Sequence, residues 1–270
     1  MYKIPIDTHV HTSTFSDHAQ CTFGQFWKRG AEIGLKGIGV TGHIHNDPSG
    51  KTDAERFILY NSYFLCQKLI KREKYGVKLY RGAEIDIADK DGSLWGSDIE
   101  NDFFDFDGTL DYLILSQLDY AIASAHHYTM DEGILNITAS EGTNMYINAI
   151  KHPRISILGH IGRGGIPYEL SEVAKAVKEL GKTIEINEGD SLKTPDEVRK
   201  IASHCAETGT LISIGSDSHA FDRFNSDIFS STLAILEEIS FPLELIVNRD
   251  IQSFEAFINI KEQEEGLCIK

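Results

Sequence analysis

The sequence has no long hydrophobic run, and this absence argues against one class of protein. None of its apolar stretches approaches the roughly 20 residues that a membrane-spanning helix needs. The amino terminus, MYKIPIDTHVHT, also lacks the basic lead and apolar stretch that are typical of a signal peptide. We therefore expect a cytoplasmic protein that does not associate with membranes.

Cysteine is sparse as well. The four cysteines lie far apart and form no C-x-x-C pair (Cys21, Cys66, Cys205 and Cys268). This spacing argues against a zinc ribbon or a disulfide framework and favours isolated reduced thiols. The sequence also contains no G-x-S-x-G motif and no P-loop, so it indicates neither a serine nucleophile nor a nucleotide-phosphate loop.

Basic residues are too few to balance the acidic ones. The chain has 26 lysines and arginines against 41 aspartates and glutamates, for a formal net charge of -15. Such a surface repels polyanions, so we do not expect extended nucleic-acid binding. A small anionic substrate is compatible with this charge, because bound metal ions reverse the field locally.

Short strand-like runs alternate with amphipathic helical stretches over the 270 residues. Seven strands alternating with helices predict a parallel α/β sheet that is closed, or nearly closed, into one barrel domain spanning residues 1–270. The expected strands are Lys3–His9, Gly37–Thr41, Val77–Ile85, Tyr120–Ala125, Ser156–Gly159, Thr183–Asn187 and Leu211–Gly215. The expected helices are Thr22–Ile33, Ala54–Lys74, Ser140–Ile150, Glu169–Leu180 and Pro195–Glu207.

Terminal signals support several of these helices. Glycines follow four of the helical stretches, where a left-handed residue commonly ends a helix (Gly34, Gly76, Gly181 and Gly209). Thr194 is the expected N-cap before Pro195.

Two segments depart from the alternation. The polar stretch 88–108 is interpreted as an insertion or lid near the barrel mouth, and the late helices Ser231–Ile239 and Ser253–Ile260 are expected to close the base.

Histidines gather at the carboxyl ends of the expected strands. Six of the eleven lie within about a residue of such an end (His9, His11, His43, His126, His160 and His219). In a parallel barrel these ends converge on one mouth, where active sites are built. His9 with His11, and Asp217 with His219, lie two residues apart and so point to one face of a strand. Imidazoles combined with carboxylates suit zinc, manganese or iron.

Two further positions complete the candidate metal site. Glu84 lies at the end of the strand Val77–Ile85, where its carboxylate can bridge two cations among the imidazoles. Asp17 and His18 lie in the loop after the first strand, and from the residues alone either one can reach the same cluster.

These segments together resemble the motif series of the PHP (polymerase and histidinol phosphatase) family. The likeness is carried by T-H-V-H-T, V-T-G-H, G-A-E-I, S-A-H-H, L-G-H-I-G and G-S-D-S-H, and it extends from Ile4 to about Ile258. It is greatest to the small stand-alone phosphatases, which also share E-I-N after the sixth strand. The resemblance implies a distorted seven-stranded β/α barrel, TIM-like and of PHP type, that holds two to three divalent ions, with zinc first and manganese or iron as alternatives.

The resemblance also implies a ligand set for each ion. One ion would be held by His9, His11, Glu84 and Asp217, and a second by Glu84, His126 and His160. The third would take His18, His43 and His219, so the family favours His18 over Asp17. Two positions depart from the family pattern: Gly42 stands where an aspartate is usual, and Ile161 where a proline is common.

We interpret the chain as a metal-dependent phosphatase that hydrolyses small phosphomonoesters, with histidinol phosphate as one candidate substrate. Clustered metals would neutralise phosphate charge and generate a bound hydroxide that attacks phosphorus in line. The residues expected to act in catalysis are Glu84, Asp217 and Arg163. Asp217 is a candidate proton shuttle, and Arg163 a candidate phosphate clamp because guanidinium matches phosphate geometry.

Two other functions remain open at this point. A metal-dependent amidohydrolase also begins with H-x-H and ends with a strand-end aspartate, although Glu84 and the D-x-H ending speak against it. A non-catalytic accessory module would bind metal without turning over any ester, although a complete ligand set argues against that reading.

Overall fold

A computed structural model of the chain describes residues 2–16, 18–45, 67–99, 108–126 and 137–259. Its centre is a nearly closed barrel of seven parallel strands, so the predicted fold class is confirmed. In barrel order these are β1 (Ile6–Val10), β2 (Gly37–Ile44), β4 (Val77–Asp86), β5 (Tyr120–Ser124), β6 (Ile157–Leu158), β7 (Thr183–Asn187) and β8 (Ile212–Gly215).

The barrel closes between β1 and β8 through both backbone and side chains. Beyond the end of β8, the Asp217 amide donates to the His9 carbonyl at 2.8 Å, and the His11 amide donates to the Ser218 carbonyl at 2.9 Å. The side-chain nitrogen of Asn248, Nδ2, also joins the two strands, because it donates to the carbonyls of Ile6 in β1 and Ile214 in β8, both at 2.8 Å. The carboxyl ends of the first and last strands are therefore held side by side.

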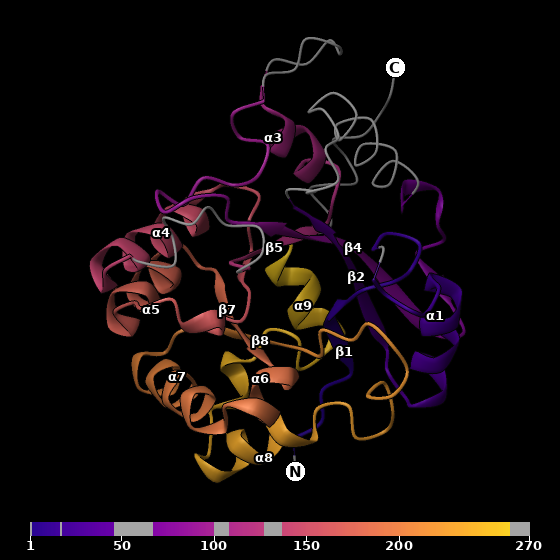
Figure 1. Cartoon of the computed structure of the whole chain (residues 1–270). Coiled ribbons are helices and arrows are strands. Elements are labelled where there is room, and N and C mark those ends of the chain that lie inside the picture. Colours follow the sequence, from indigo (N-terminus) through magenta and orange to yellow (C-terminus); the bar gives the residue numbers. More distant parts are fainter. Residues whose placement is uncertain (1, 17, 46–66, 100–107, 127–136, 260–270) are drawn as a thin grey trace.

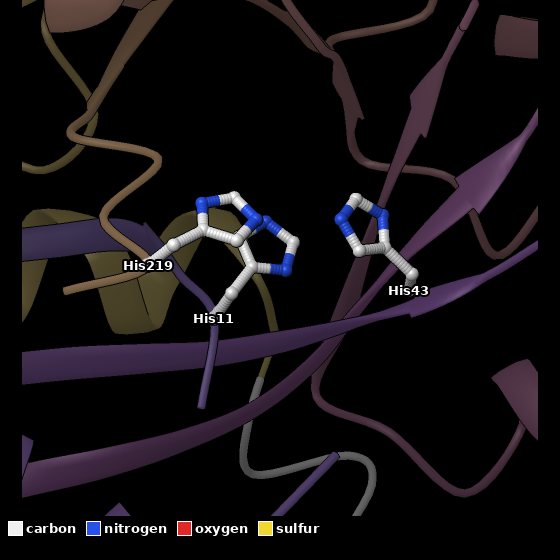
Figure 2. Close-up of side chains that lie close together, drawn as sticks. All are labelled: His11, His43 and His219. Carbon is white, nitrogen blue, oxygen red and sulfur yellow. The ribbon is translucent and has the colours of Figure 1, made fainter. Parts of the chain in front are cut away.

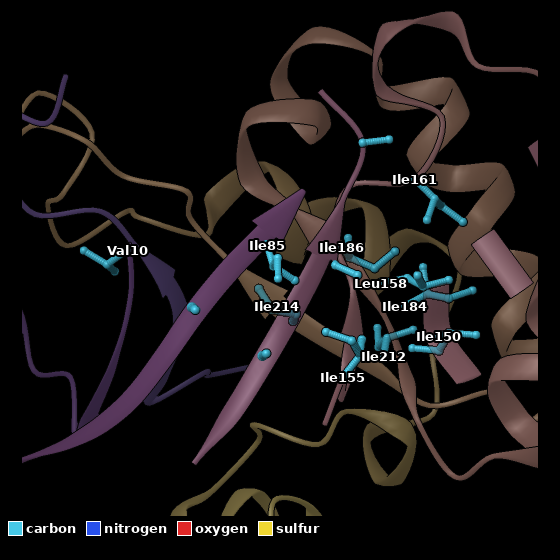
Figure 3. Packing of buried hydrophobic residues seen from close by; sticks show 14 of the residues in the cluster. Val10, Ile85, Ile150, Ile155, Leu158, Ile161, Ile184, Ile186, Ile212 and Ile214 are labelled. Carbon is cyan, nitrogen blue, oxygen red and sulfur yellow. The ribbon is translucent and has the colours of Figure 1, made fainter. Parts of the chain in front are cut away.

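Helices surround the strands in the described chain, as Figure 1 shows. Strand residues alternate between the barrel interior and these helices: Figure 3 shows Ile184, Ile186, Ile212 and Ile214 in the aliphatic cluster that packs against them. The helices are α1 (Phe23–Glu32), α3 (Leu110–Leu115), α4 (Ala139–Lys151), α5 (Leu170–Glu179), α6 (Glu188–Lys193), α7 (Pro195–Thr208), α8 (Ser230–Glu238) and α9 (Ile251–Phe257), with short 3-10 turns at Arg163–Gly165 and Leu243–Leu245.

Of the two late helices expected to close the barrel base, α9 does so, whereas α8 packs against the outer helices α6 and α7. The ring of Phe254 in α9 is fully buried and packs edge-on against Tyr80 at 4.9 Å and Tyr120 at 5.5 Å between centroids. The Tyr120 hydroxyl reaches across the interior and donates to the Thr8 carbonyl. Gly39 leaves room for this ring, since a Cβ there would lie 1.8 Å from the Tyr120 oxygen. The base is therefore apolar and filled.

Two local expectations are wrong, and a third is confirmed without its usual hydrogen bond. The helix expected to reach Lys74 instead gives way to a short strand, β3 (Glu73–Lys74), which pairs antiparallel with β4. Gly76 accordingly forms a hairpin turn with Tyr75, both at positive φ, and is not a helix cap. Thr194 does occupy the N-cap of α7, but its hydroxyl donates to the Asp190 carbonyl and makes no capping bond.

The expected insertion is only partly described. Residues 88–99 form a turn that packs on α4, where the Asn148 side chain donates to the Asp91 carbonyl at 2.9 Å. Residues 100–107 lie outside the described chain, as do Asp17 and the first part of the expected helix Ala54–Lys74. Among the described residues, no helix has both the length and the apolar composition needed to cross a membrane.

Candidate metal centre

The end of β1 brings two imidazoles together with two carboxylates. The Nε2 atoms of His9 and His11 lie 2.9 Å apart. Each is 3.3 Å from one oxygen of Glu84, and His11 Nε2 is 3.2 Å from Asp217 Oδ1. One ligand atom from each of these four residues lies within 4.8 Å of all the others. This grouping matches the first expected ligand set.

Glu84 occupies the centre of the cluster and uses both of its oxygens. Its Oε1 is 2.8 Å from His160 Nε2 and 3.5 Å from His126 Nε2. Its Oε2 is 3.0 Å from His43 Nδ1, since β2 and β4 pair with His43 opposite Glu84. Burial alone would raise the pKa of Glu84, but the surrounding imidazoles hold it well below its ordinary value. The carboxylate therefore stays ionised and lies where it can bridge two cations.

A third group consists of imidazoles. Figure 2 shows the rings of His11 and His219 overlapping and the ring of His43 beside them, although the three come from different parts of the barrel. The ring centroids of His11 lie 4.1 Å from His43 and 4.2 Å from His219. His18 joins them, at 4.9 Å from His43 and 4.6 Å from His219. All nine expected metal ligands thus lie in one connected cluster.

Several atoms of the cluster fit divalent cations. Within the described ranges, some buried ring nitrogens have no hydrogen-bond partner, including Nε2 of His43, Nδ1 of His160 and Nε2 of His219. Buried polar atoms are rarely left unsatisfied, and imidazole nitrogen and carboxylate oxygen together suit zinc. His160 and Asp217 also take positive φ values of 26° and 55°, which indicates that local backbone strain is tolerated at these two positions.

Two carboxylates lie behind the imidazoles, and sequence reasoning missed both. Asp86 Oδ1 is 2.7 Å from His126 Nδ1, and Glu185 Oε1 is 2.7 Å from His9 Nδ1. Burial alone would lower the pKa of His126, but Glu84 and Asp86 raise it to about 9. The available signal was a charged residue at an inward-facing position of an otherwise apolar strand.

Arg163 connects the cluster with a neighbouring helix. Its Nη1 donates to Asp217 Oδ2 at 2.8 Å, while Nε and Nη2 donate to the two oxygens of Asp190 in α6 at 3.0 and 3.2 Å. Burial would lower the pKa of Arg163, but these carboxylates raise it, so the guanidinium stays charged. Arg163 also lines a cavity of about 570 Å³ that extends from His160 toward α7. Sequence reasoning missed Asp190.

The departure at Gly42 has a steric explanation. A Cβ built on Gly42 would lie 2.7 Å from the Cβ of Phe15 and 2.9 Å from the Phe15 carbonyl oxygen. Phe15 is buried and lies in the loop that also carries His18. The loop therefore occupies the space that a side chain at position 42 would need.

The chain also matches known proteins along most of its length. The family model described as "PHP domain" matches residues 7–189. A probable phosphatase of Acetivibrio thermocellus is 28% identical over 264 residues, covering 97% of this chain and 98% of the relative. A probable phosphatase of Clostridium novyi is 32% identical over 272 residues, covering 99% of both.

A solved structure shares the fold. The histidinol phosphate phosphatase of Lactococcus lactis, in complex with zinc, L-histidinol and phosphate, superposes with a TM-score of 0.54 at 18% identity. The match covers 88% of this chain and 94% of the Lactococcus chain.

Proposed function

The chain belongs to the PHP domain family, and we propose that it hydrolyses small phosphomonoesters at two or three divalent metal ions held in the barrel mouth. The relatives described above are named probable phosphatases, and the chain matches them over nearly their whole lengths. The chain is accordingly a phosphatase of this family. The observation that carries the proposal is the convergence of histidines and carboxylates on both oxygens of Glu84.

The first proposed ligand set follows the geometry of the cluster, and the other two follow the family resemblance. His9, His11, Glu84 and Asp217 would hold one ion, and Glu84 would share a second with His126 and His160. A third would lie among His18, His43 and His219, with His11 stacked beside them. Zinc suits these nitrogen and oxygen donors best, with manganese or iron as alternatives. Ions bound here would neutralise the charge of the phosphate and would lower the pKa of a bound water toward about 7.

Arg163 would bind the phosphoryl group of the substrate. Three of its five N–H groups are occupied by Asp190 and Asp217, which leaves two to donate toward an anion at the mouth. The guanidinium is held in place before substrate arrives, so little conformational entropy is lost when an oxygen binds.

Asp217 would serve as a ligand and as an orienting group. Its Oδ1 lies near His9 and His11, and its Oδ2 accepts from Arg163. Burial would raise the pKa of Asp217, but His9 and His11 hold it well below its ordinary value. Both oxygens of Asp217 are thus engaged, one with the cluster and one with Arg163, and these contacts support the two roles.

The cavity beside Arg163 would receive the organic part of the ester. Its volume of about 570 Å³ is within the range of small-molecule sites. It is lined both by polar residues such as Asn187 and Asp190 and by apolar ones such as Ile161 and Ile186. Histidinol phosphate is one candidate, because the Lactococcus protein was solved with L-histidinol and phosphate. Other small phosphomonoesters fit the same description.

The test measures phosphate release from a panel of phosphomonoesters, histidinol phosphate included, by zinc-loaded protein. We expect release from at least one ester, and we expect it to disappear on chelation and in the Asp217→Ala variant. Asp227→Ala is the matched control, since it removes an exposed aspartate outside the cluster and should leave the rate unchanged. Release that survives chelation would contradict the proposal. Bound zinc without release from any ester would instead favour an amidohydrolase or an accessory metal-binding module.

A further inference from the structure

One strand of the barrel contributes none of the proposed metal ligands. The six other parallel strands each carry at least one candidate ligand within the strand or just past its end, whereas β7 carries none. β7 instead presents Glu185 to the barrel interior, and the neighbours of this residue, Ile184 and Ile186, face the outer helices. Glu185 is only 2% exposed, so a carboxylate has been placed deep in the barrel beside the cluster.

Glu185 makes three contacts, two of them with strands that carry ligands. Its Oε1 lies 2.7 Å from Nδ1 of His9 on β1. Its Oε2 accepts from the backbone amide of His160, beyond β6, at 3.1 Å, and from the side chain of Asn187 at 3.3 Å. One carboxylate thus connects β1 with the end of β6.

The approach of Glu185 to His9 depends on a glycine in β8. A Cβ on Gly215 would lie 2.3 Å from Glu185 Oε1 and 2.6 Å from His9 Cβ. Neither Glu185 Oε1 nor His9 Cβ can move aside easily, because both atoms belong to buried side chains in the barrel interior. The contact between Glu185 and His9 therefore depends on three strands of the barrel, β1, β7 and β8.

We infer that Glu185 is a positioning residue, which holds the His9 ring with its proton on Nδ1 and directs the Nε2 lone pair toward Glu84 and Asp217. This inference rests on the metal cluster of the proposed function. A neutral imidazole carries one N–H, and the hydrogen bond made by one nitrogen decides which nitrogen is free to bind a metal. The same carboxylate fixes the backbone of His160, so it orients ligands of two neighbouring ions.

Two observations support this role over that of a direct ligand. Glu185 contacts His9 at Nδ1, whereas the cluster lies at Nε2, which is 3.3 Å from Glu84 Oε2. Glu185 is thus on the opposite edge of the ring. Asp86 stands in the same relation to His126, at 2.7 Å from Nδ1, while Nε2 of that ring faces Glu84. The arrangement therefore occurs twice in one site.

The experiment compares zinc binding and histidine tautomers in the full chain. Zinc affinity is measured by competition with a chromogenic chelator for the wild type, Glu185→Gln and Glu188→Gln. Glu188 is a matched control: it is also buried, but it accepts from the amides of Ser231 and Thr232, away from the cluster. We expect Glu185→Gln to keep the zinc stoichiometry and to lose roughly 10- to 100-fold in affinity, with Glu188→Gln unchanged.

Nitrogen-15 spectra of histidine-labelled protein report the tautomer directly. The wild type should show His9 protonated at Nδ1, and Glu185→Gln should show this preference weakened, which a merely structural role would not produce. A wild-type His9 protonated at Nε2 would overturn the inference even if the variant did not fold. So would wild-type affinity in Glu185→Gln, or loss of one whole equivalent of zinc with an unchanged His9 signal. A wild type that bound no zinc would overturn the proposed function and this inference with it.

Discussion

Adding a side chain at position 42 should destabilise the protein, although the resemblance to the PHP family implies an aspartate there. Gly42 lies in β2, which is paired residue by residue with β4 from Gly37 to Ile44. The strand therefore has little freedom to move away from the loop. An added Cβ at 2.7 Å from the Phe15 Cβ and 2.9 Å from its carbonyl oxygen must displace that loop.

The size of the effect follows from the contact. Forcing one extra carbon into a well-packed site costs typically about 1–3 kcal/mol. In a domain of this size each kcal/mol shifts the melting temperature by roughly 2–4 °C, so Gly42→Ala should melt about 2–12 °C below the wild type. Gly42→Asp should fall further, because it also buries a charge. Zinc affinity should fall too, since the displaced loop carries His18.

Differential scanning fluorimetry of the metal-free protein measures the shift, with Gly24→Ala as the control. Gly24 lies in α1, and a Cβ there would meet nothing within 4 Å. Alanine favours a helix over glycine, so this control should melt at or slightly above the wild-type temperature. If Gly42→Ala melted at the same temperature as Gly24→Ala, the close contact with Phe15 would not exist in solution, and the steric explanation would be refuted.

Three further predictions concern other parts of the molecule. Arg163→Lys should lower kcat/KM for phosphate release roughly 100-fold, because one ammonium cannot replace the fork that joins Asp190 to Asp217; wild-type kinetics would contradict this. Phe254→Ala should lower the free energy of unfolding in urea by about 3–5 kcal/mol, yet the folded variant should keep its kcat, since this ring fills the base and not the mouth. Burial lowers the pKa of Lys182 from 10.5 to about 8. At a pH between these two values, Lys182 is protonated in the unfolded chain and deprotonated in the folded one, so the unfolded chain binds more protons. The stability of the wild type relative to Lys182→Met should therefore rise with pH across that window, and urea titrations that show it falling would reject the assignment.

Much of the barrel was predictable, because its strands are short apolar runs bounded by helices with clear end signals. All seven parallel strands were located, most of them to within a residue or two at each end. The failures lie where the local signal is short or ambiguous. The six-residue helices α3 and α6 were missed, and the β3–β4 hairpin was read as the end of a helix because its charged residues also favour helices.

The ligand candidates could be found because they require only a position along a strand, whereas the groups that orient them require the register between strands. A residue at a carboxyl end lies at the mouth of any parallel barrel. Which inward residues meet one another depends on the stagger of the strands, and that stagger is a property of the closed barrel. Glu185 faces His9 only because β7 pairs with β8, β8 closes onto β1, and Gly215 leaves room between them. No pattern within a single strand contains those three facts, so alternation could show that Glu185 points inward but not which ring it would hold.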